Sequence, residues 1–376
     1  MIKLGITGQN GFIGWHLLQT ASLKSSDFEL IPFDRKFFDD PEALDAFTSS
    51  CDAIVHLAGV NRHPDIEIIY KTNIDLAEKL IASLYRTKAK THVLFSSSSQ
   101  ELKDNPYGRS KKEARKMFEA WSNETANLFT GFVIPNVFGP FGRPFYNSVV
   151  ATFCHQINNG ESPRIDQDGL LNLIYVGELV EKILGEIQSV NNLELRSRVI
   201  NVTHTAEIKV SELLEKLRYF ASAYLEKNEV PKLDNTFDHH LFNTFRCFMP
   251  METAFPRKFK LNTDQRGTFV EIARMGISGQ TSFSTTAQGI TRGNHFHTRK
   301  IERFAVIKGK ARIQLRKIGT DQVFNYELDG NETSFVDMPI WYTHNITNTG
   351  DDLLYTVFWI NEPYDPSDPD TFFENV

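Results

Sequence analysis

The chain has 376 residues, of which 41% are hydrophobic and 23% are charged, a composition typical of globular proteins that excludes disordered and membrane-spanning classes. Its 41 lysines and arginines against 47 aspartates and glutamates give a formal charge of −6, which argues against nucleic-acid binding because such proteins usually carry a basic face. The 3 cysteines lie far apart, so we expect no disulfide framework and a cytoplasmic location.

Short apolar runs alternate with longer helical patterns in residues 1–250, and the first run begins too early to leave room for a signal peptide. The predicted strands are Ile2–Thr7, Glu29–Phe33, Ala53–Leu57, His92–Phe95 and Leu128–Ile134, and the predicted helices are Phe12–Ala21, Pro41–Thr48, Tyr70–Arg86 and Tyr107–Thr125. Strands that alternate with helices pair in parallel through right-handed crossovers. We therefore predict an α/β doubly wound, Rossmann-type domain over residues 1–250.

A glycine-rich turn follows the first strand. Gly8 permits a tight turn, Gly11 lets the backbone approach a pyrophosphate, and Gly14 allows the helix to pack closely on the sheet. The helix that opens with Phe12 and Ile13 offers free N–H groups and the positive end of its dipole to the phosphates. The turn predicts dinucleotide binding, the alternative being an ordinary strand–helix connection.

The spacing of these glycines, GxxGxxG, resembles that of the short-chain dehydrogenase/reductase superfamily, in its extended branch that acts on nucleotide sugars. The resemblance implies that Leu57, Ala58 and Gly59, at the end of the third strand, line the cofactor site. Asp34 would accept a hydrogen bond from the ribose of NAD(H), whereas the adjacent Arg35 would bind the 2′-phosphate of NADPH. We predict NADPH, on the resemblance of the whole chain described below, with NAD(H) as the alternative.

A serine run, Ser96–Ser99, precedes a tyrosine and a lysine that share one helix face. Tyr107 and Lys111 are four residues apart, and a nearby ammonium is expected to lower the pKa of the phenol. A tuned phenol passes a proton to a carbonyl oxygen while hydride arrives from nicotinamide. The superfamily resemblance implies that Ser98, Tyr107 and Lys111 are catalytic and that Tyr107 and Lys111 also contact the cofactor. Ser97 is the alternative serine, and an ordinary amphipathic helix is the alternative for YxxxK.

The segments 135–140 and 143–148 resemble the substrate region of the extended branch. The resemblance implies that Asn136, Arg143 and Asn147 contact the nucleotide and the sugar. For each of them the alternative is a role in shaping a loop.

After residue 250 the helical periods end and short strands rich in β-branched and aromatic residues follow, beyond a linker at Met249–Lys260. The predicted strands are Thr268–Ile272, Gln280–Thr285, Glu302–Ile307, Lys310–Leu315, Gln322–Leu328, Ser334–Met338 and Leu353–Trp359. Short strands at regular spacing with turns between them predict an all-β barrel over residues 251–376.

Two motifs in this region resemble the cupin family. The pattern G-x5-H-x-H-x4-E-x6-G over residues 289–309 matches the first cupin motif, and P-x4-H-x3-N over 339–348 resembles the second. The second motif usually has glycine where Trp341 stands. We therefore expect a different local turn, with Trp341 narrowing the mouth of the cavity.

The cupin motifs bring together a candidate set of metal ligands. His295 and His297 occupy alternate positions of a strand and so face one side, Glu302 comes from the next strand, and His344 is the third histidine after residue 250. Three imidazoles and a carboxylate suit zinc or another divalent first-row metal. The alternative is a metal-free cupin that uses a histidine as base.

The whole chain resembles the bifunctional reductase-epimerases of capsular polysaccharide and O-antigen synthesis, which make UDP-N-acetyl-L-talosamine on the way to UDP-N-acetyl-L-fucosamine. The segments that carry the resemblance are DNPYGRSKKE, PFYNSVVATFCHQI, PKLDNTFDHHLFNTF, GITRGNHFH and PDTFFENV. It implies that the cupin epimerises C3 of a UDP-2-acetamido-2,6-dideoxy-4-hexulose, a UDP-linked 4-keto-6-deoxy amino sugar, and that the first domain reduces its C4 ketone with NADPH. It also implies a homo-oligomer, either a dimer or a tetramer.

Two other functions are compatible with the sequence. One is a monofunctional nucleotide-sugar 4-reductase or epimerase whose cupin is structural. The other is a nicotinamide-binding regulatory protein with a sensor cupin, although an intact set of Ser98, Tyr107 and Lys111 argues against it.

Overall fold

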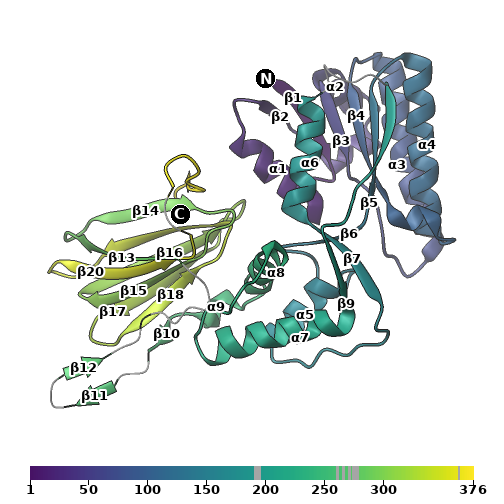
Figure 1. Cartoon of the computed structure of the whole chain (residues 1–376). Coiled ribbons are helices and arrows are strands. Elements are labelled where there is room, and N and C mark those ends of the chain that lie inside the picture. Colours follow the sequence, from purple (N-terminus) through teal and green to yellow (C-terminus); the bar gives the residue numbers. More distant parts are fainter. Residues whose placement is uncertain (190–195, 260–261, 265–266, 270–271, 273–278, 363–364) are drawn as a thin grey trace. The chain divides into compact units, whose positions relative to one another are not determined.

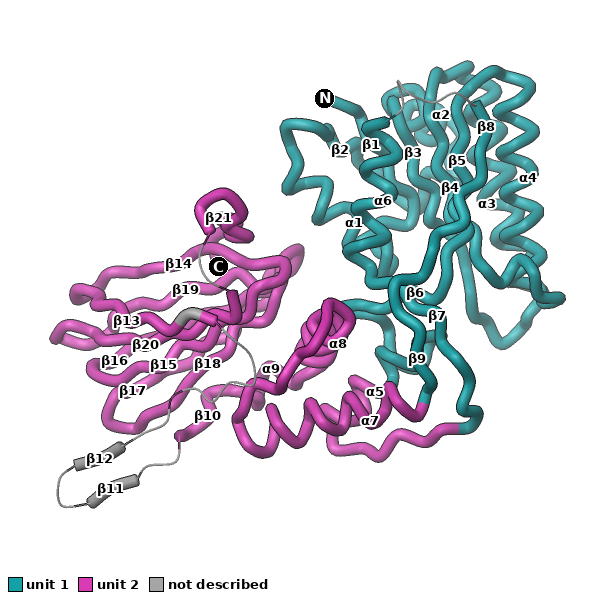
Figure 2. Tube along the Cα trace, viewed as in Figure 1, with its two compact units in different colours: residues 1–152, 166–210 teal, residues 153–165, 211–376 magenta. Residues whose placement is uncertain are grey.

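The computed structural model describes residues 1–376 except 190–195, 260–261, 265–266, 270–271, 273–278 and 363–364 (Figure 1). Its contacts divide the chain into two compact units, residues 1–152 with 166–210 and residues 153–165 with 211–376 (Figure 2). The predicted boundary after residue 250 falls inside the second unit, where helices give way to strands, and it stays a prediction. The predicted strand Thr268–Ile272 lies partly outside the described residues.

The first unit is built on a parallel sheet with the strand order β2-β1-β3-β4-β5-β8. These strands are β1 (Ile2–Thr7), β2 (Phe28–Ile31), β3 (Ala53–His56), β4 (His92–Ser98), β5 (Phe129–Ile134) and β8 (Ser197–Asn201). The chain adds β2 on one side of β1 and β3 on the other, so the order reverses at β1. Open sheets of this kind bind ligands at the carboxyl ends of the strands where the order reverses.

Helices cover both faces of this sheet (Figure 1). One face carries α1 (Phe12–Leu23) and α6 (Val176–Gln188), and the other carries α2 (Pro41–Ser50), α3 (Ile66–Thr87) and α4 (Pro106–Thr125). The second face buries a core that includes Leu80, Phe118 and Trp121, which are at most 1% exposed. The doubly wound prediction is therefore confirmed.

Smaller elements complete the first unit. Two short 3-10 helices are η1 (Arg35–Asp39) and η2 (Ser99–Leu102), and a separate sheet contains β6 (Asn136–Phe138), β7 (Leu170–Tyr175) and β9 (Ala206–Lys209). Helix η2 connects β4 to α4, so it lies between the predicted serine and the predicted tyrosine along the chain.

The second unit joins helices to an all-β domain. Its helical elements are α5 (Val149–Asn158, which begins in the first unit), α7 (Val210–Phe220), η4 (Ala221–Glu226), α8 (Thr236–Arg246) and α9 (Met251–Ala254). These helices and α6 are not among the elements predicted from the sequence. Among the helices described in either unit, none combines the length and the apolar character that a bilayer crossing requires.

The all-β domain contains two five-stranded sheets, ordered β10-β18-β15-β20-β13 and β17-β16-β19-β14-β21, and a hairpin of β11 and β12. The strands are β10 (Arg257–Lys258), β11 (Asn262–Asp264), β12 (Gly267–Phe269), β13 (Gln280–Thr286), β14 (Thr291–Phe296), β15 (Glu302–Lys308), β16 (Lys310–Lys317), β17 (Val323–Asp329), β18 (Ser334–Met338), β19 (Tyr342–Asn348), β20 (Leu354–Ile360) and β21 (Phe372–Phe373). Their pairing is antiparallel throughout, which confirms the predicted all-β, cupin-like domain.

Candidate functional site

The glycine turn between β1 and α1 is packed so closely that two of its positions have no room for a side chain. Gly8 has a φ of +76°, and a Cβ there would lie 2.7 Å from the backbone nitrogen of Ala58. A Cβ on Gly14 would lie 2.2 Å from the carbonyl oxygen of Gly8, which also accepts the N–H of Gly11 at 2.9 Å. The turn therefore lies against the end of β3, where Leu57 donates its N–H to the carbonyl of Thr7.

A Gly14→Ala variant is expected to bind NADPH at least about 10-fold more weakly, because the added Cβ forces the phosphate turn open. Titration of the cofactor followed by fluorescence measures the effect. Gly185→Ala is the control: Gly185 is an exposed residue of α6 with no atom within 4 Å of an added Cβ. That variant should bind NADPH normally and gain about 0.4–1 kcal/mol of unfolding free energy. Equal NADPH affinities in the two variants would contradict the role of the turn.

The segment after β2 places an acidic residue, Asp34, and a basic residue, Arg35, beside this turn. The carboxylate of Asp34 caps η1 by accepting the N–H of Lys36 at 2.8 Å, and Arg35 beside it is exposed. Gln9 of the glycine turn donates its side-chain N–H to the carbonyl of Phe33 at 2.8 Å. The hydrogen bond of Gln9 therefore ties the second strand to the turn, while one oxygen of Asp34 is already engaged.

The predicted catalytic side chains meet at the carboxyl end of β4. Asn105 caps α4 by accepting the N–H of Gly108 at 2.8 Å, which fixes the helix start that carries Tyr107. The side chain of Ser98 hydrogen-bonds Tyr107, and Nζ of Lys111 lies 5.9 Å from the centre of the Tyr107 ring. A Cβ added to Gly59 would lie 3.6 Å from the same Nζ. The structure thus brings the tyrosine, the lysine and the predicted cofactor segment together.

The two candidate serines differ in their partners. Ser97 donates its hydroxyl to Oε2 of Glu101 at 2.7 Å and is buried, whereas Ser98 contacts Tyr107. Ser96 contributes its carbonyl, which accepts from Nζ of Lys111 at 2.9 Å. The geometry therefore favours Ser98 over Ser97.

The acid–base properties of this group differ from the expectation in one respect. Burial raises the pKa of Tyr107 to about 12, and the hydrogen bond of Ser98 opposes that shift only in part. Burial also lowers the pKa of Lys111 to about 8. The expectation that the ammonium lowers the phenol pKa is wrong for this arrangement, because desolvation outweighs it. A phenol that keeps its proton at neutral pH is suited to donate one.

The keto-reduction rate is expected to fall as pH rises through about 8, because Lys111 is cationic below its folded pKa and neutral above it. Burial lowers this pKa because desolvation favours the neutral amine over the ammonium. The pH profile of kcat/KM measures this fall in rate at alkaline pH. In Lys111→Arg the fall should move to higher pH, because a guanidinium keeps its charge. If the rate of Lys111→Arg falls at the same pH as that of the unmodified chain, the fall is caused by another group.

A charged pair that the sequence analysis missed fixes η2 on α4. Arg115 donates to both oxygens of Glu101, at 3.0 and 3.1 Å, and the two side chains are 12% and 9% exposed. A Cβ added to Gly108 would lie 2.1 Å from the carbonyl of Gln100, so η2 and α4 are in close contact. These contacts hold Ser98, which precedes η2, near Tyr107. The glycine after the motif tyrosine is the one local signal of this packing.

The predicted substrate residues lie on different elements. Asn136 is exposed on β6, Arg143 stacks on Tyr146 at 4.8 Å, and Asn147 donates its side-chain N–H to the carbonyl of Asn61 at 3.0 Å. Tyr146 also raises the pKa of Tyr107, an effect smaller than that of burial. Asn147 has a φ of +133°, a strained value for a residue with a side chain.

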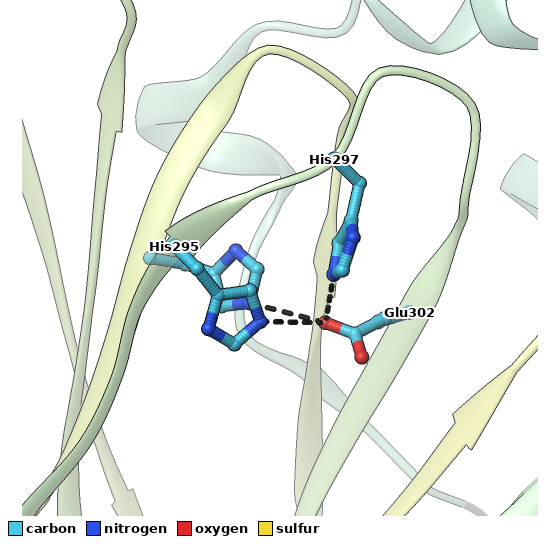
Figure 3. Close-up of side chains that lie close together, drawn as sticks. His295, His297 and Glu302 are labelled. Carbon is cyan, nitrogen blue, oxygen red and sulfur yellow. Dashed lines mark ion pairs between the residues drawn. The ribbon is translucent and has the colours of Figure 1, made fainter. Parts of the chain in front are cut away.

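The four predicted metal ligands converge in the cupin-like domain, and Figure 3 labels three of them, His295, His297 and Glu302. Their ligand atoms all lie within 4.8 Å of one another. Oε2 of Glu302 is 3.1 Å from Nε2 of His297 and 3.1 Å from Nε2 of His344, and 4.0 Å from Nε2 of His295. Oε2 of Glu302 and the Nε2 atoms of His297 and His344 are buried, and among the described residues they have no hydrogen-bond partner outside the cluster. Converging buried donors of this chemistry fit a divalent cation.

The charge states of the cluster also suit a cation. Burial would raise the pKa of Glu302, but His297 and His344 hold it well below its usual range. Burial lowers the pKa of His295 to about 4, with the two other histidines acting in the same direction. At neutral pH the carboxylate is therefore charged, and the imidazole of His295 is neutral with a lone pair to offer.

Trp341, which stands where the second cupin motif usually has glycine, adopts a left-handed backbone conformation. It has a φ of +62°, its N–H donates to the carbonyl of His297 at 2.8 Å, and its ring stacks on Phe296 at 5.5 Å. Phe296 and His295 are neighbours on a strand and point to opposite faces. The expectation of a narrowed mouth is wrong, because the tryptophan is buried on the other side of β14, while the expectation of a different turn stays a prediction.

A doubly wound parallel sheet with a glycine turn and a Ser–Tyr–Lys group, followed by a cupin-like domain, defines the class of short-chain dehydrogenase/reductases that carry a β appendage. Residues 4–202 match the NAD dependent epimerase/dehydratase family, and residues 262–372 match the polysaccharide biosynthesis C-terminal domain. The chain belongs to the bifunctional reductase-epimerases of the NAD dependent epimerase/dehydratase family.

Similar proteins cover the whole chain. It is 32% identical to the UDP-2-acetamido-2,6-beta-L-arabino-hexul-4-ose reductase of Pseudomonas aeruginosa, over 99% of this chain and 98% of that protein. It is 33% identical to the capsular polysaccharide assembling protein CapF from Staphylococcus aureus, over 100% of both chains with a TM-score of 0.62. RMD from Pseudomonas aeruginosa complexed with NADPH, 22% identical over 59% of this chain and 83% of its own with a TM-score of 0.53, shares the fold.

Proposed function

We propose that this chain reduces the C4 ketone of a UDP-2-acetamido-2,6-dideoxy-4-hexulose and epimerises the same sugar at C3, to give UDP-N-acetyl-L-talosamine for capsule or O-antigen synthesis. The observation that carries the proposal is the contact of Ser98 with a protonated Tyr107, one helical turn before Lys111. The similarity to a UDP-hexul-4-ose reductase along nearly the whole chain supports the substrate class.

Reduction requires a proton donor at the ketone oxygen and a group that holds this oxygen in place. The phenol of Tyr107 gives its proton to O4, and the hydroxyl of Ser98 orients O4 by a hydrogen bond. The ammonium of Lys111 favours the phenolate that remains and binds the nicotinamide ribose. A nicotinamide cofactor, when bound, supplies hydride to C4, so that one hydride and one proton convert the ketone to an alcohol.

NADPH is the cofactor that the end of β2 favours. One oxygen of Asp34 already accepts a backbone N–H. Arg35, the next residue, is exposed and would bind the 2′-phosphate of NADPH. NAD(H) is the alternative, and a comparison of kcat/KM with the two cofactors separates them.

The cupin residues His295, His297, Glu302 and His344 would hold a divalent cation, for which zinc is the first candidate. Such an ion, when bound, polarises a ketone and makes the hydrogen on the adjacent carbon more acidic. Glu302 and His344 are buried, so they would keep water away from their side of a bound ion. Epimerisation at C3 must precede reduction, because it needs the ketone that reduction removes.

We assign reduction to residues 1–250 and epimerisation to residues 251–376 of a cytoplasmic homo-oligomer. The test is incubation of the full chain with enzymatically made UDP-4-keto-6-deoxy-N-acetylhexosamine and NADPH in deuterated water, followed by NMR of the product. We expect an alcohol at C4 and deuterium at C3. A product without deuterium at C3 would leave a 4-reductase with a structural cupin, and no turnover of NADPH would overturn the assignment as a reductase.

A further inference from the structure

The C-terminal segment folds back on the strand that carries His295. Residues 370–375, here called the C-terminal strap, include β21, which pairs with β14 (Figure 2). Glu374 donates its N–H to the carbonyl of Asn294 at 2.9 Å, and Arg316 donates to the Glu374 carboxylate at 2.9 Å and to the carbonyl of Asn375 at 2.5 Å. The strap is therefore anchored to the sheet that carries two of the candidate ligands.

The carboxylate of Asp370 holds the turn that follows His297. It accepts N–H groups of Thr298, Arg299 and Lys300, each at 3.0 Å, and the hydroxyl of Thr298 at 2.6 Å. Asp370 is 4% exposed and has a φ of +40°, a left-handed value that is costly for a residue with a side chain. Four hydrogen bonds to one buried carboxylate hold this strained backbone in place.

The strained backbone places the carbonyl of Asp370 against a candidate metal ligand. Nδ1 of His297 lies 2.5 Å from this carbonyl, which can only accept, so Nδ1 carries the proton. Nε2 is then the nitrogen that faces the cluster, 3.1 Å from Oε2 of Glu302, and its lone pair becomes available to a metal once Nε2 loses its proton. Histidines that bind metals are usually oriented by such a partner on the other ring nitrogen.

The strap also places an exposed aromatic ring beside the open side of the cluster. The side chain of His295 is 24% exposed, against 8% for Glu302 and 1% for His344, so the cluster opens at His295. Phe373 is directly opposite His295 in the β14–β21 pair, and side chains of opposite residues leave the sheet on the same face. Phe373 is 77% exposed, whereas its neighbour Phe372 stacks on Phe296 at 5.5 Å on the other face.

We propose that the C-terminal strap is a working part of the cupin site: Asp370 is a positioning residue that aims His297 at the metal, and Phe373 contacts the sugar ring of the nucleotide sugar at the mouth. The proposal rests on the proposed metal site and substrate. A ketone that approaches the ion brings the sugar beside His295, so the ring opposite His295 meets the sugar and not the uridine. The C–H face of a pyranose is a suitable partner for an aromatic ring.

The metal arm of the test compares Asp370→Ala with Asp368→Ala in the full chain, with Zn²⁺ alone as the probe and a chromophoric chelator as competitor. Asp368 is the matched control because it is 65% exposed and pairs with the side chain of Arg299, not with the backbone N–H groups of the turn. We expect Asp370→Ala to bind Zn²⁺ roughly 10- to 100-fold more weakly and Asp368→Ala to bind it normally. Asp370→Asn, which keeps one acceptor oxygen, should show an intermediate loss if the alanine variant does not fold.

Equal Zn²⁺ affinities of Asp370→Ala and the unmodified chain would overturn the role of Asp370, and so would an equal loss in Asp368→Ala. A second readout is the ring-nitrogen NMR of His297 in metal-free protein. In the unmodified chain we expect the proton to stay on Nδ1 of His297. In Asp370→Ala we expect it to exchange between the two ring nitrogens. If Asp370 only stabilises the fold, the tautomer of His297 should be the same in both proteins. Failure of the unmodified chain to bind Zn²⁺ would instead overturn the proposed metal site itself.

The substrate arm compares Phe373→Ala with Phe283→Ala. Phe283 is similarly exposed, at 71%. It is paired with Val357, whereas Glu302 is paired with Ile360, three residues further along the same strand. Since side chains alternate between the two faces of a sheet, Phe283 and Glu302 lie on opposite faces. We expect Phe373→Ala to raise KM for C3 deuterium exchange roughly 3- to 10-fold, with Zn²⁺ affinity and inhibition by UDP unchanged. Equal KM values in the two variants would overturn the contact, and weaker inhibition by UDP would move it from the sugar to the uridine.

Discussion

A Tyr107→Phe variant is expected to lose keto reduction by roughly 10²- to 10⁴-fold, the usual contribution of a positioned general acid. The ring keeps its volume, and the change removes the hydroxyl that contacts Ser98 and carries the proton. The cupin cluster uses none of these side chains, so exchange of the C3 hydrogen with solvent deuterium should persist. Oxidation of NADPH measures reduction, and proton NMR of the same samples measures exchange.

Tyr85→Phe is the matched control for this variant. Its hydroxyl donates to Glu124 on the surface between α3 and α4, away from the carboxyl ends of the strands. Both reactions should proceed normally in the control. A Tyr107→Phe chain that reduces the ketone at the normal rate would contradict the assignment as a reductase, and loss of both reactions would contradict two separate sites.

The elements that the sequence predicted well are those with a local signal. The strands β1 and β18 have the predicted bounds, because each is an apolar run next to a turn or a charged segment. Helix α4 starts one residue before the predicted position, since Asn105 caps it and Pro106 suits its first turn. The spacing of His295, His297, Glu302 and His344 likewise belongs to two short motifs, so the cluster could be predicted as a group.

Contacts between distant segments carry no such signal. Nothing near Glu101 or Arg115 in the sequence indicates that they pair across a loop, and Asp370 follows His297 by 73 residues. The shift of the Tyr107 pKa could not be predicted either, because it depends on how much of the chain covers the phenol. The turn at Trp341 shows the same limit: a left-handed backbone usually indicates glycine, but stacking on Phe296 and a bond to His297 stabilise it here.

Replacing His344 by alanine is expected to weaken Zn²⁺ binding by more than about 100-fold, because loss of an outer partner of a ligand already costs roughly 10- to 100-fold. His344 is 1% exposed and its Nε2 lies 3.1 Å from Glu302, so the change removes one donor and leaves a buried carboxylate with one partner fewer. Deuterium exchange at C3 should be lost with the metal, while NADPH binding by the first unit should be unchanged. Chelator competition, NMR and cofactor titration measure the three quantities.

His204→Ala is the control for this change, since His204 belongs to the first unit and its side chain is 38% exposed. The combination of results distinguishes the possible roles of the cluster. Normal Zn²⁺ affinity in His344→Ala would contradict a metal site at these four residues. Lost Zn²⁺ with normal exchange would contradict a catalytic ion, and exchange that disappears in His344→Ala but survives complete chelation of the unmodified chain would favour a histidine base over a metal.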